Sequence, residues 1–145
     1  MAYVLTVDDE GHVRRLLGHL ISREGHEVGE AGNADEALAS MEQRAADVVF
    51  TDIQMPGNDG RWLTIELRKR YPHTAIVLAT SVQDLEATIT LRFGVISYLI
   101  KPFNPESVRK ALEMAVAWHN EAKTAGTEKV EELRLEEWLD SLEIL

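Results

Sequence analysis

Carboxylate, hydroxyl and ammonium side chains follow four short apolar runs of the sequence, at the point where each run ends. They are Asp8 and Asp9 after the first run, then Asp52, Thr80 and Lys101. Two carboxylates about 4 Å apart repel by ~4 kcal/mol at an effective dielectric constant of 20, so a cluster of them favours a bound cation. Oxygen ligands suit a hard divalent ion, and Mg²⁺ is the most natural one. The pattern therefore predicts a Mg²⁺ site beside a hydroxyl and an ammonium group.

The apolar runs are predicted to be strands of one parallel sheet. Residues 3–7, 48–51, 75–79 and 95–100 are almost continuously apolar, which indicates strands covered on both faces. Residues 27–31 are more polar and predict a strand toward the edge. Segments of helical period lie between these strands, and the alternation predicts an α/β fold with helices on both faces of the sheet. Ligands bind such sheets beyond the carboxyl ends of the strands, which is where the polar residues fall.

Helix signals complete five βα units. The apolar stripes are Val13, Leu16, Leu17, Leu20 and Ile21; Ala34, Ala37, Leu38 and Met41; Leu63, Ile65 and Leu67; and Val108, Leu112, Ala115 and Val116. Asn33, Asp84 and Asn104 are expected N-caps, and Pro105 suits a first helical position. The Thr-Ile-Thr run at residues 88–90 lowers helix propensity, so we expect its helix to be the least stable of the five.

The order and spacing of the polar residues resemble the receiver domain of two-component response regulators, over about residues 2–119. The matching features are Asp8-Asp9, Asp52 with the Met-Pro-Gly-Asn-Asp-Gly loop at 55–60, Thr80, and Lys101-Pro102. The resemblance implies a doubly wound five-stranded parallel sheet of flavodoxin-like strand order 2-1-3-4-5. It also implies a phosphorelay domain that is phosphorylated by a histidine kinase or histidine phosphotransfer protein and switches conformation to control a partner or output domain.

The resemblance further implies roles for the acidic residues. Asp52 would be the phosphoacceptor. Asp9, Asp52 and the backbone carbonyl of Gln54 would ligate Mg²⁺ directly, and Asp8 would act through water. The chemistry of the residues agrees, because a carboxylate is already a nucleophile at neutral pH and needs no general base. The chain would be a signalling phosphoacceptor that assists its own phosphorylation and dephosphorylation, rather than an enzyme, with Mg²⁺ as its cofactor.

The remaining residues of the pattern would bind the phosphoryl group and report its presence. By the resemblance, Thr80 would donate its hydroxyl to one phosphoryl oxygen and Lys101 would pair with another. Tyr98 would move inward when Thr80 is drawn toward the phosphoryl group. The Lys101-Pro102 peptide bond is usually cis in this family. Phosphoryl transfer spreads negative charge over three oxygens, so cations placed beside them supply most of the catalysis.

Three other classes of protein compete with this interpretation. A haloacid-dehalogenase-like phosphatase also uses an Asp nucleophile and Mg²⁺, but its nucleophile opens an Asp-x-Asp motif after the first strand, where this sequence has Asp8-Asp9-Glu10. A flavodoxin-like redox carrier would need a Ser/Thr/Gly-rich phosphate loop at the same place. A pseudo-receiver that binds partners without phosphorylation is disfavoured by the full set of acidic, hydroxyl and Lys residues.

Composition narrows the partners and the compartment. The 145 residues include 15 Lys and Arg against 25 Asp and Glu, a net charge of −10, which disfavours nonspecific binding to nucleic acid or anionic membranes. The absence of Cys excludes disulfides and thiol chemistry. No apolar run approaches the ~18 residues that span a bilayer, and the start of the chain lacks the charged region of a signal peptide. We expect a cytoplasmic protein with no direct contact to nucleic acid or membrane.

We expect a receiver domain at residues 1–120, followed at 121–145 by a linker and an acidic amphipathic C-terminal helix. Residues 122–127 interrupt the helical pattern, and Thr127 is expected to cap the last helix. The apolar residues that recur on one face of that helix are Leu135, Trp138, Leu142 and Leu145, with Leu139 beside them. Such a stripe should not remain in water, so it predicts docking on the receiver, a homodimer, or contact with a downstream output domain.

Overall fold

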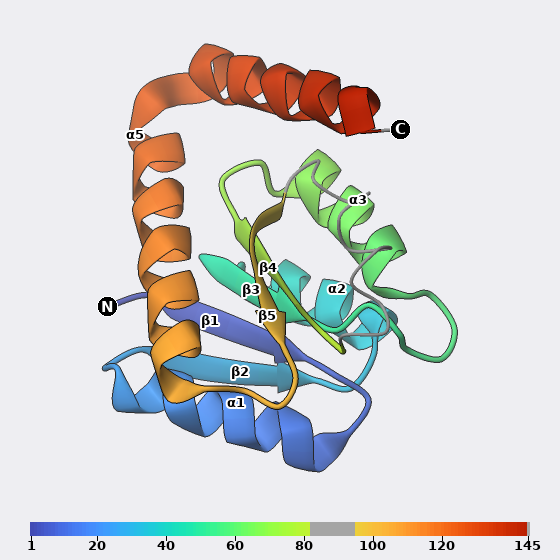
Figure 1. Cartoon of the computed structure of the whole chain (residues 1–145). Coiled ribbons are helices and arrows are strands. Elements are labelled where there is room, and N and C mark those ends of the chain that lie inside the picture. The colour runs from blue at the N-terminus through green and yellow to red at the C-terminus, as the bar shows by residue number, and fades with distance from the viewer. Residues whose placement is uncertain (82–94, 145) are drawn as a thin grey trace.

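Five parallel strands form one sheet with helices on both faces in the computed structural model of the chain (Figure 1). The strands are β1 (Tyr3–Val7), β2 (Glu27–Ala31), β3 (Val48–Thr51), β4 (Ala75–Thr80) and β5 (Val95–Ile100). The helices are α1 (Gly11–Arg23), α2 (Ala34–Gln43), α3 (Gly60–Arg70) and α5 (Pro105–Ile144). The structure describes the backbone of residues 1–81 and 95–144, and the side chains of residues 1–81 and 95–124.

The order of the strands is β2-β1-β3-β4-β5, which confirms the predicted doubly wound fold. Every residue of β3 and β4 is buried, because helices cover both faces of these strands. The polar strand β2 lies at the edge, as predicted, and exposes Glu27 and Glu30. β1 and β3 are neighbours in register, with Val7 opposite Thr51. The residues that follow them, Asp8 and Asp52, are therefore brought together.

Two hydrophobic clusters hold the helices to the sheet. α1 and α5 cover one face through a cluster that includes Val4 and Phe50, and α2 and α3 cover the other through a cluster that includes Leu5 and Val49 (Figure 1). Successive side chains of a strand point to opposite faces, so each buried strand contributes to both clusters. Burial of apolar surface stabilises a fold by about 25 cal/mol per Å², so these clusters fix the positions of the strand ends.

Two of the predicted helix starts are confirmed by hydrogen bonds. The Asn33 side chain accepts a bond from the backbone N–H of Glu36 at 2.8 Å, and the Asn104 side chain accepts one from the N–H of Glu106 at 2.8 Å. The predicted cap Asp84 and the Thr-Ile-Thr run at 88–90 lie outside the described residues.

Two residues of the predicted apolar stripes face solvent. Leu16 is 50% exposed and Ile65 is 44% exposed, whereas Leu17 and Leu63 on the same helices are buried. A residue two positions from Leu63 is turned about 200° around a helix of 3.6 residues per turn, so Ile65 points away from the sheet. The prediction that these two side chains belong to buried stripes is wrong.

The last helix is longer than the sequence predicted. α5 runs from Pro105 to Ile144 and does not show the interruption expected at residues 122–127. Gly126 costs a helix about 1 kcal/mol relative to Ala, and the helix-favouring residues around it outweigh that cost. The division into a receiver at 1–120 and a linker with a helix at 121–145 stays a prediction. Within the described part of the chain, no helix is long and apolar enough to cross a membrane.

Candidate functional site

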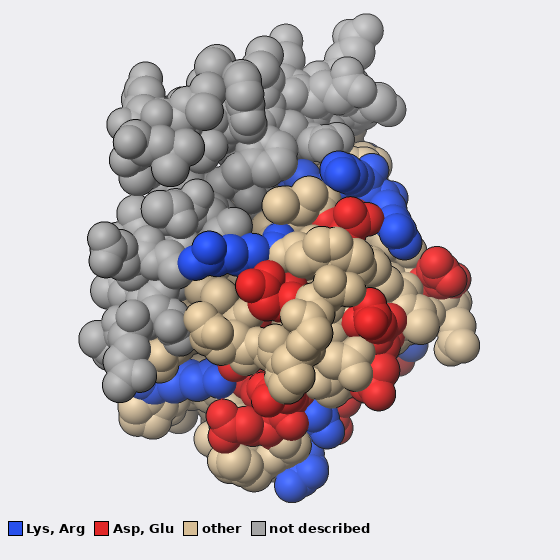
Figure 2. Space-filling model, turned by 90° about the vertical axis from the view of Figure 1, so that its right-hand side faces the viewer, with Lys and Arg blue, Asp and Glu red and all other residues tan. Residues whose placement is uncertain are grey.

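Three aspartates meet at the carboxyl edge of the sheet. Carboxylate oxygens of Asp8, Asp9 and Asp52 all lie within 4.8 Å of one another. Asp8 and Asp52 are 4% and 6% exposed, whereas Asp9 faces solvent. Figure 2 views the molecule from the side toward which β1 and β2 point in Figure 1, and acidic side chains gather on that face. The arrangement confirms that the acidic residues singled out from the sequence form one cluster, and it is able to hold a cation.

Lys101 bridges two of these aspartates from the end of β5. Its Nζ donates to Asp8 Oδ2 at 2.9 Å and to Asp52 Oδ2 at 3.1 Å. Burial lowers the pKa of Lys101, but the two carboxylates outweigh burial and raise the pKa above its ordinary value. Lys101 is therefore a permanent cation at neutral pH. The peptide bond between Lys101 and Pro102 is cis.

The surroundings of Asp52 disfavour the ionised form of its carboxylate. Burial raises its pKa above the ordinary value for Asp, and the negative charge of Asp8 adds to this effect. The charge of Lys101 and a hydrogen bond from the backbone N–H of Ile53, at 2.8 Å, lower the pKa without cancelling the rise. A single ammonium group thus does not balance the cluster, and a further cation would stabilise the ionised form of Asp52.

The loop that carries Asp8 is fixed by neighbours that sequence reasoning missed. The Asp8 side chain accepts a hydrogen bond from the N–H of Glu10 at 2.9 Å. Arg14, in the first turns of α1, donates from Nη1 to the Asp8 carbonyl oxygen at 2.7 Å and from Nε to Glu30 at 2.9 Å. Arg14 therefore ties the ends of β1 and β2 together beneath the acidic cluster. In the sequence, the position of Arg14 shortly after the acidic pair is the one feature that points to a contact with the Asp8 loop.

A glycine sets how closely α3 approaches Asp52. A Cβ atom on Gly60 would lie 2.1 Å from the backbone oxygen of Asp52, which no side chain can tolerate. The N–H of Gly60 donates to the carbonyl of Ile53 at 2.9 Å, and the Asp59 side chain caps the helix. Gly57 has a φ of +76°, a conformation that glycine adopts readily. The Met-Pro-Gly-Asn-Asp-Gly loop therefore serves to place Asp52 as well as to connect β3 to α3.

Thr80 ends β4 with a buried hydroxyl. The residue is 0% exposed, and its Oγ1 has no hydrogen-bond partner among the described residues. A buried polar group without a partner costs about 1–3 kcal/mol, so this hydroxyl would gain from a bound acceptor. Tyr98 lies on β5 opposite Leu78 and is half-buried, and Gln54 is exposed two residues after Asp52. The inward movement of Tyr98 and the metal-ligating role of the Gln54 carbonyl stay predictions.

Comparison with known families identifies the class of protein that this fold and site define. A family model described as the response regulator receiver domain matches residues 4–113. The chain belongs to the family of response regulator receiver domains.

Curated relatives of this chain include transcriptional regulators. This chain is 33% identical to the transcriptional regulatory protein AruR of Pseudomonas aeruginosa over 142 residues. The aligned region covers 94% of this chain and 58% of AruR. The chain is also 33% identical to the transcriptional regulatory protein ResD of Bacillus subtilis over 105 residues. That aligned region covers 72% of this chain and 44% of ResD. The match thus spans about half the length of these two relatives, and about a quarter of others such as the response regulator protein FleR of Pseudomonas aeruginosa, at 26%.

Solved structures show the same fold. The receiver domain of NtrX from Brucella abortus is 34% identical with a TM-score of 0.75, over 79% of this chain and 98% of that domain. The response regulator TrrA of Thermotoga maritima, solved in complex with Mg²⁺-BeF, is 30% identical with a TM-score of 0.72, over 79% of this chain and 99% of TrrA.

Proposed function

We propose that Asp52 accepts a phosphoryl group from a phosphohistidine of a histidine kinase or histidine phosphotransfer protein. The observation that carries the proposal is the bridge from Lys101 to Asp8 and Asp52, which places a permanent cation beside the expected nucleophile. Membership of the receiver family supports the same reaction. The chain is itself modified, so we class it as a signalling phosphoacceptor that assists its own phosphorylation and dephosphorylation, and not as an enzyme.

The donor atoms of the acidic cluster fit Mg²⁺. Asp9 and Asp52 would hold the ion with the backbone carbonyl of Gln54, and Asp8 would contribute through water. Hard oxygen ligands within 4.8 Å of one another suit this ion. When bound, Mg²⁺ would neutralise negative charge on the transferred group. The Mg²⁺-BeF complex of the related TrrA supports the choice of metal.

Each protein group has a defined part in the transfer. A carboxylate oxygen of Asp52 forms the new O–P bond while the N–P bond of the donor breaks, and the donor imidazole leaves with that electron pair. Lys101, already 3.1 Å from Asp52 Oδ2, neutralises a phosphoryl oxygen after transfer. The buried Thr80 hydroxyl donates to another phosphoryl oxygen and so gains a partner, since it has none among the described residues. That gain exists only after phosphorylation, so it shifts the population toward a second conformation, in which Tyr98 turns inward.

The conformational change would be read by another protein or domain. ResD and AruR are transcriptional regulators of which the match covers only 44% and 58%, which supports an output domain as the recipient. A net charge of −10 argues against direct binding of nucleic acid by these residues. We place the protein in the cytoplasm, where its phosphodonor would also be found.

The proposed function is tested by phosphorylation with a small donor. Incubation with acetyl phosphate and Mg²⁺ should add one phosphoryl group, detected by intact-mass spectrometry and removed by hydroxylamine, which cleaves acyl phosphates. Chelation of the metal should prevent the addition, because the acidic cluster then lacks its second cation. A protein that stays unmodified by both acetyl phosphate and phosphoramidate in Mg²⁺ would contradict the proposal.

Mg²⁺ alone should raise the melting temperature by several degrees. An ion that binds only the folded state stabilises it by about 2.7 kcal/mol at one hundred times its Kd. Asp9→Asn removes one carboxylate of the cluster, so the same Mg²⁺ concentration should give a clearly smaller rise. Asp35→Asn is the matched control, since Asp35 is exposed, lies outside the cluster of three aspartates and accepts its hydrogen bond from the Asn58 amide. Equal responses of the three proteins in differential scanning fluorimetry would count against the metal site.

A further inference from the structure

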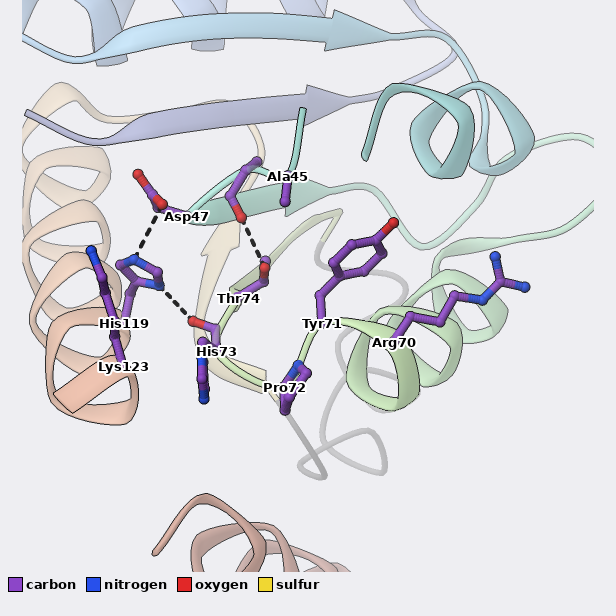
Figure 3. Close-up of a pocket in the computed structure, with 10 residues that line it drawn as sticks. Ala45, Asp47, Arg70, Tyr71, Pro72, His73, Thr74, His119 and Lys123 are labelled. Atoms are coloured by element: carbon purple, nitrogen blue, oxygen red, sulfur yellow. Dashed lines mark hydrogen bonds and ion pairs between the residues drawn. The ribbon is translucent and has the colours of Figure 1, made fainter. Parts of the chain in front are cut away.

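A cavity of about 370 Å³ opens at the amino edge of the sheet, away from the aspartate cluster (Figure 3). The segment before β3 and the connection from α3 to β4 form its apolar walls, with Ala45, Ala46, Tyr71 and Pro72. α5 closes the opposite side with His119 and Lys123, and Arg70 lies at the end of α3 (Figure 3). The proposed phosphoryl transfer uses none of these residues.

The carboxylate that lines this cavity is engaged on both oxygens. Asp47 Oδ2 accepts a hydrogen bond from the N–H of Tyr3 at 2.9 Å, and Oδ1 lies 3.1 Å from His119 Nε2. The other ring nitrogen of His119 lies 2.6 Å from the carbonyl oxygen of His73. The His119 side chain is only 12% exposed. Asp47 thus fixes the α5 wall of the cavity with both oxygens, although its side chain is 35% exposed.

The groups left to face a ligand are mostly basic. Arg70 and Lys123 are exposed at the rim. Arg70 contacts Glu66 at 3.1 Å and Glu42 at 3.9 Å, yet its side chain remains 47% exposed. A basic rim around apolar walls is unusual on a chain whose net charge is −10, and it suits a partner that is both acidic and apolar.

The chain itself contains a segment of this chemistry. Residues 128–144 carry seven acidic and two basic residues, a charge of 2 − 7 = −5. Their backbone is helical within α5, so Leu135, Trp138 and Leu142 share one helical face by their spacing. A helix of 17 residues is marginal alone, and its apolar face needs a partner.

We propose that residues 128–144 dock on the amino-edge cavity of their own chain. The apolar face would cover Tyr71 and Pro72, and the flanking acidic side chains would lie beside Arg70 and Lys123. A helix of this length extends about 25 Å. Gly126, the weakest helix former in this part of α5, is the place where the helix can change direction. Because Lys123 precedes the segment by only five residues, docking within one chain has an advantage over docking on a second copy.

Hydrogen exchange of the full-length chain tests this docking. We expect backbone amides of residues 128–144 to exchange at least about tenfold more slowly than in the Arg70→Glu/Lys123→Glu variant, whose rim repels the acidic segment. Arg61→Glu/Lys110→Glu is the matched control, because it makes the same change in charge at exposed positions of α3 and α5 outside the cavity. Trp138→Asp tests the apolar contact of the docked helix without altering the cavity. It should speed hydrogen exchange both in residues 128–144 and in the connection from α3 to β4 at 71–74.

The outcomes separate this proposal from its alternatives. Protection that grows with protein concentration would show that a second copy is the occupant, and it would overturn docking within one chain. Protection that is absent, or unchanged by both Arg70→Glu/Lys123→Glu and Trp138→Asp, would overturn it as well. The experiment needs no phosphoryl donor, and all these variants should be phosphorylated by acetyl phosphate like the native chain. Failure of the docking and failure of the proposed phosphorylation are therefore distinguishable.

Discussion

Replacement of Asp52 by asparagine should abolish phosphorylation by acetyl phosphate. An amide is not a nucleophile at neutral pH, and no other carboxylate is placed as Asp52 is, between the Lys101 ammonium and the N–H of Ile53, in the described part of the chain. Intact-mass spectrometry in Mg²⁺ should show one adduct on the native chain and none on Asp52→Asn. Asp35→Asn, an exposed change at the same edge of the sheet, should be labelled fully. Equal labelling of Asp52→Asn would move the phosphoacceptor to another residue.

The same substitution should raise the melting temperature in the absence of Mg²⁺, which shows that lost labelling is not lost folding. Burial and Asp8 raise the pKa of Asp52, so folding disfavours its ionised form. The penalty applies at pH values above the raised pKa and disappears as the pH falls through it. Asp52→Asn should therefore be more stable than the native chain at pH 7, and the difference should shrink toward acidic pH. A less stable variant at pH 7 would contradict this account of the cluster.

Gly60→Ala should be the most destabilising single methyl addition at this site. Its Cβ would lie 2.1 Å from the Asp52 carbonyl oxygen and 2.8 Å from the Ile53 Cα, and both are backbone atoms that cannot turn aside. Overpacking of this kind costs about 1–3 kcal/mol and occasionally more, and we expect a loss at or above the upper end of that range. Urea denaturation measures the loss, and labelling by acetyl phosphate should slow because α3 and Asp52 are pushed apart.

Gly11→Ala provides the matched control, since Gly11 is also the first residue of a helix that follows the acidic edge. The atom nearest to its added Cβ belongs to the flexible end of the Arg15 side chain, which is able to move. Gly11→Ala should therefore change the free energy of unfolding by less than about 1 kcal/mol. If the two substitutions cost the same, the close approach of α3 to β3 is not what places Asp52.

The strands and the membership of the acidic cluster were predictable because their signals are local. Nearly continuous apolarity marks a strand buried on both faces, and residues 48–51 and 75–79 needed no other information. Parallel neighbouring strands end at the same edge of their sheet, so polar residues directly after them must come close. That rule is enough to place Asp8 beside Asp52, and the same kind of local chemistry identifies the caps Asn33 and Asn104.

Only the tertiary structure decided which side chains on the helices reach the site and the opposite edge. Arg14 contacts the Asp8 carbonyl, Gly60 faces Asp52, and His119 reaches Asp47, because each helix docks on the sheet at one particular height and rotation. A helical pattern specifies an apolar face but neither of those two parameters. The same pattern therefore placed Leu16 in a buried stripe, although α1 as docked leaves that side chain half exposed. Contacts between elements depend on the packing of the whole core, which a local sequence pattern does not contain.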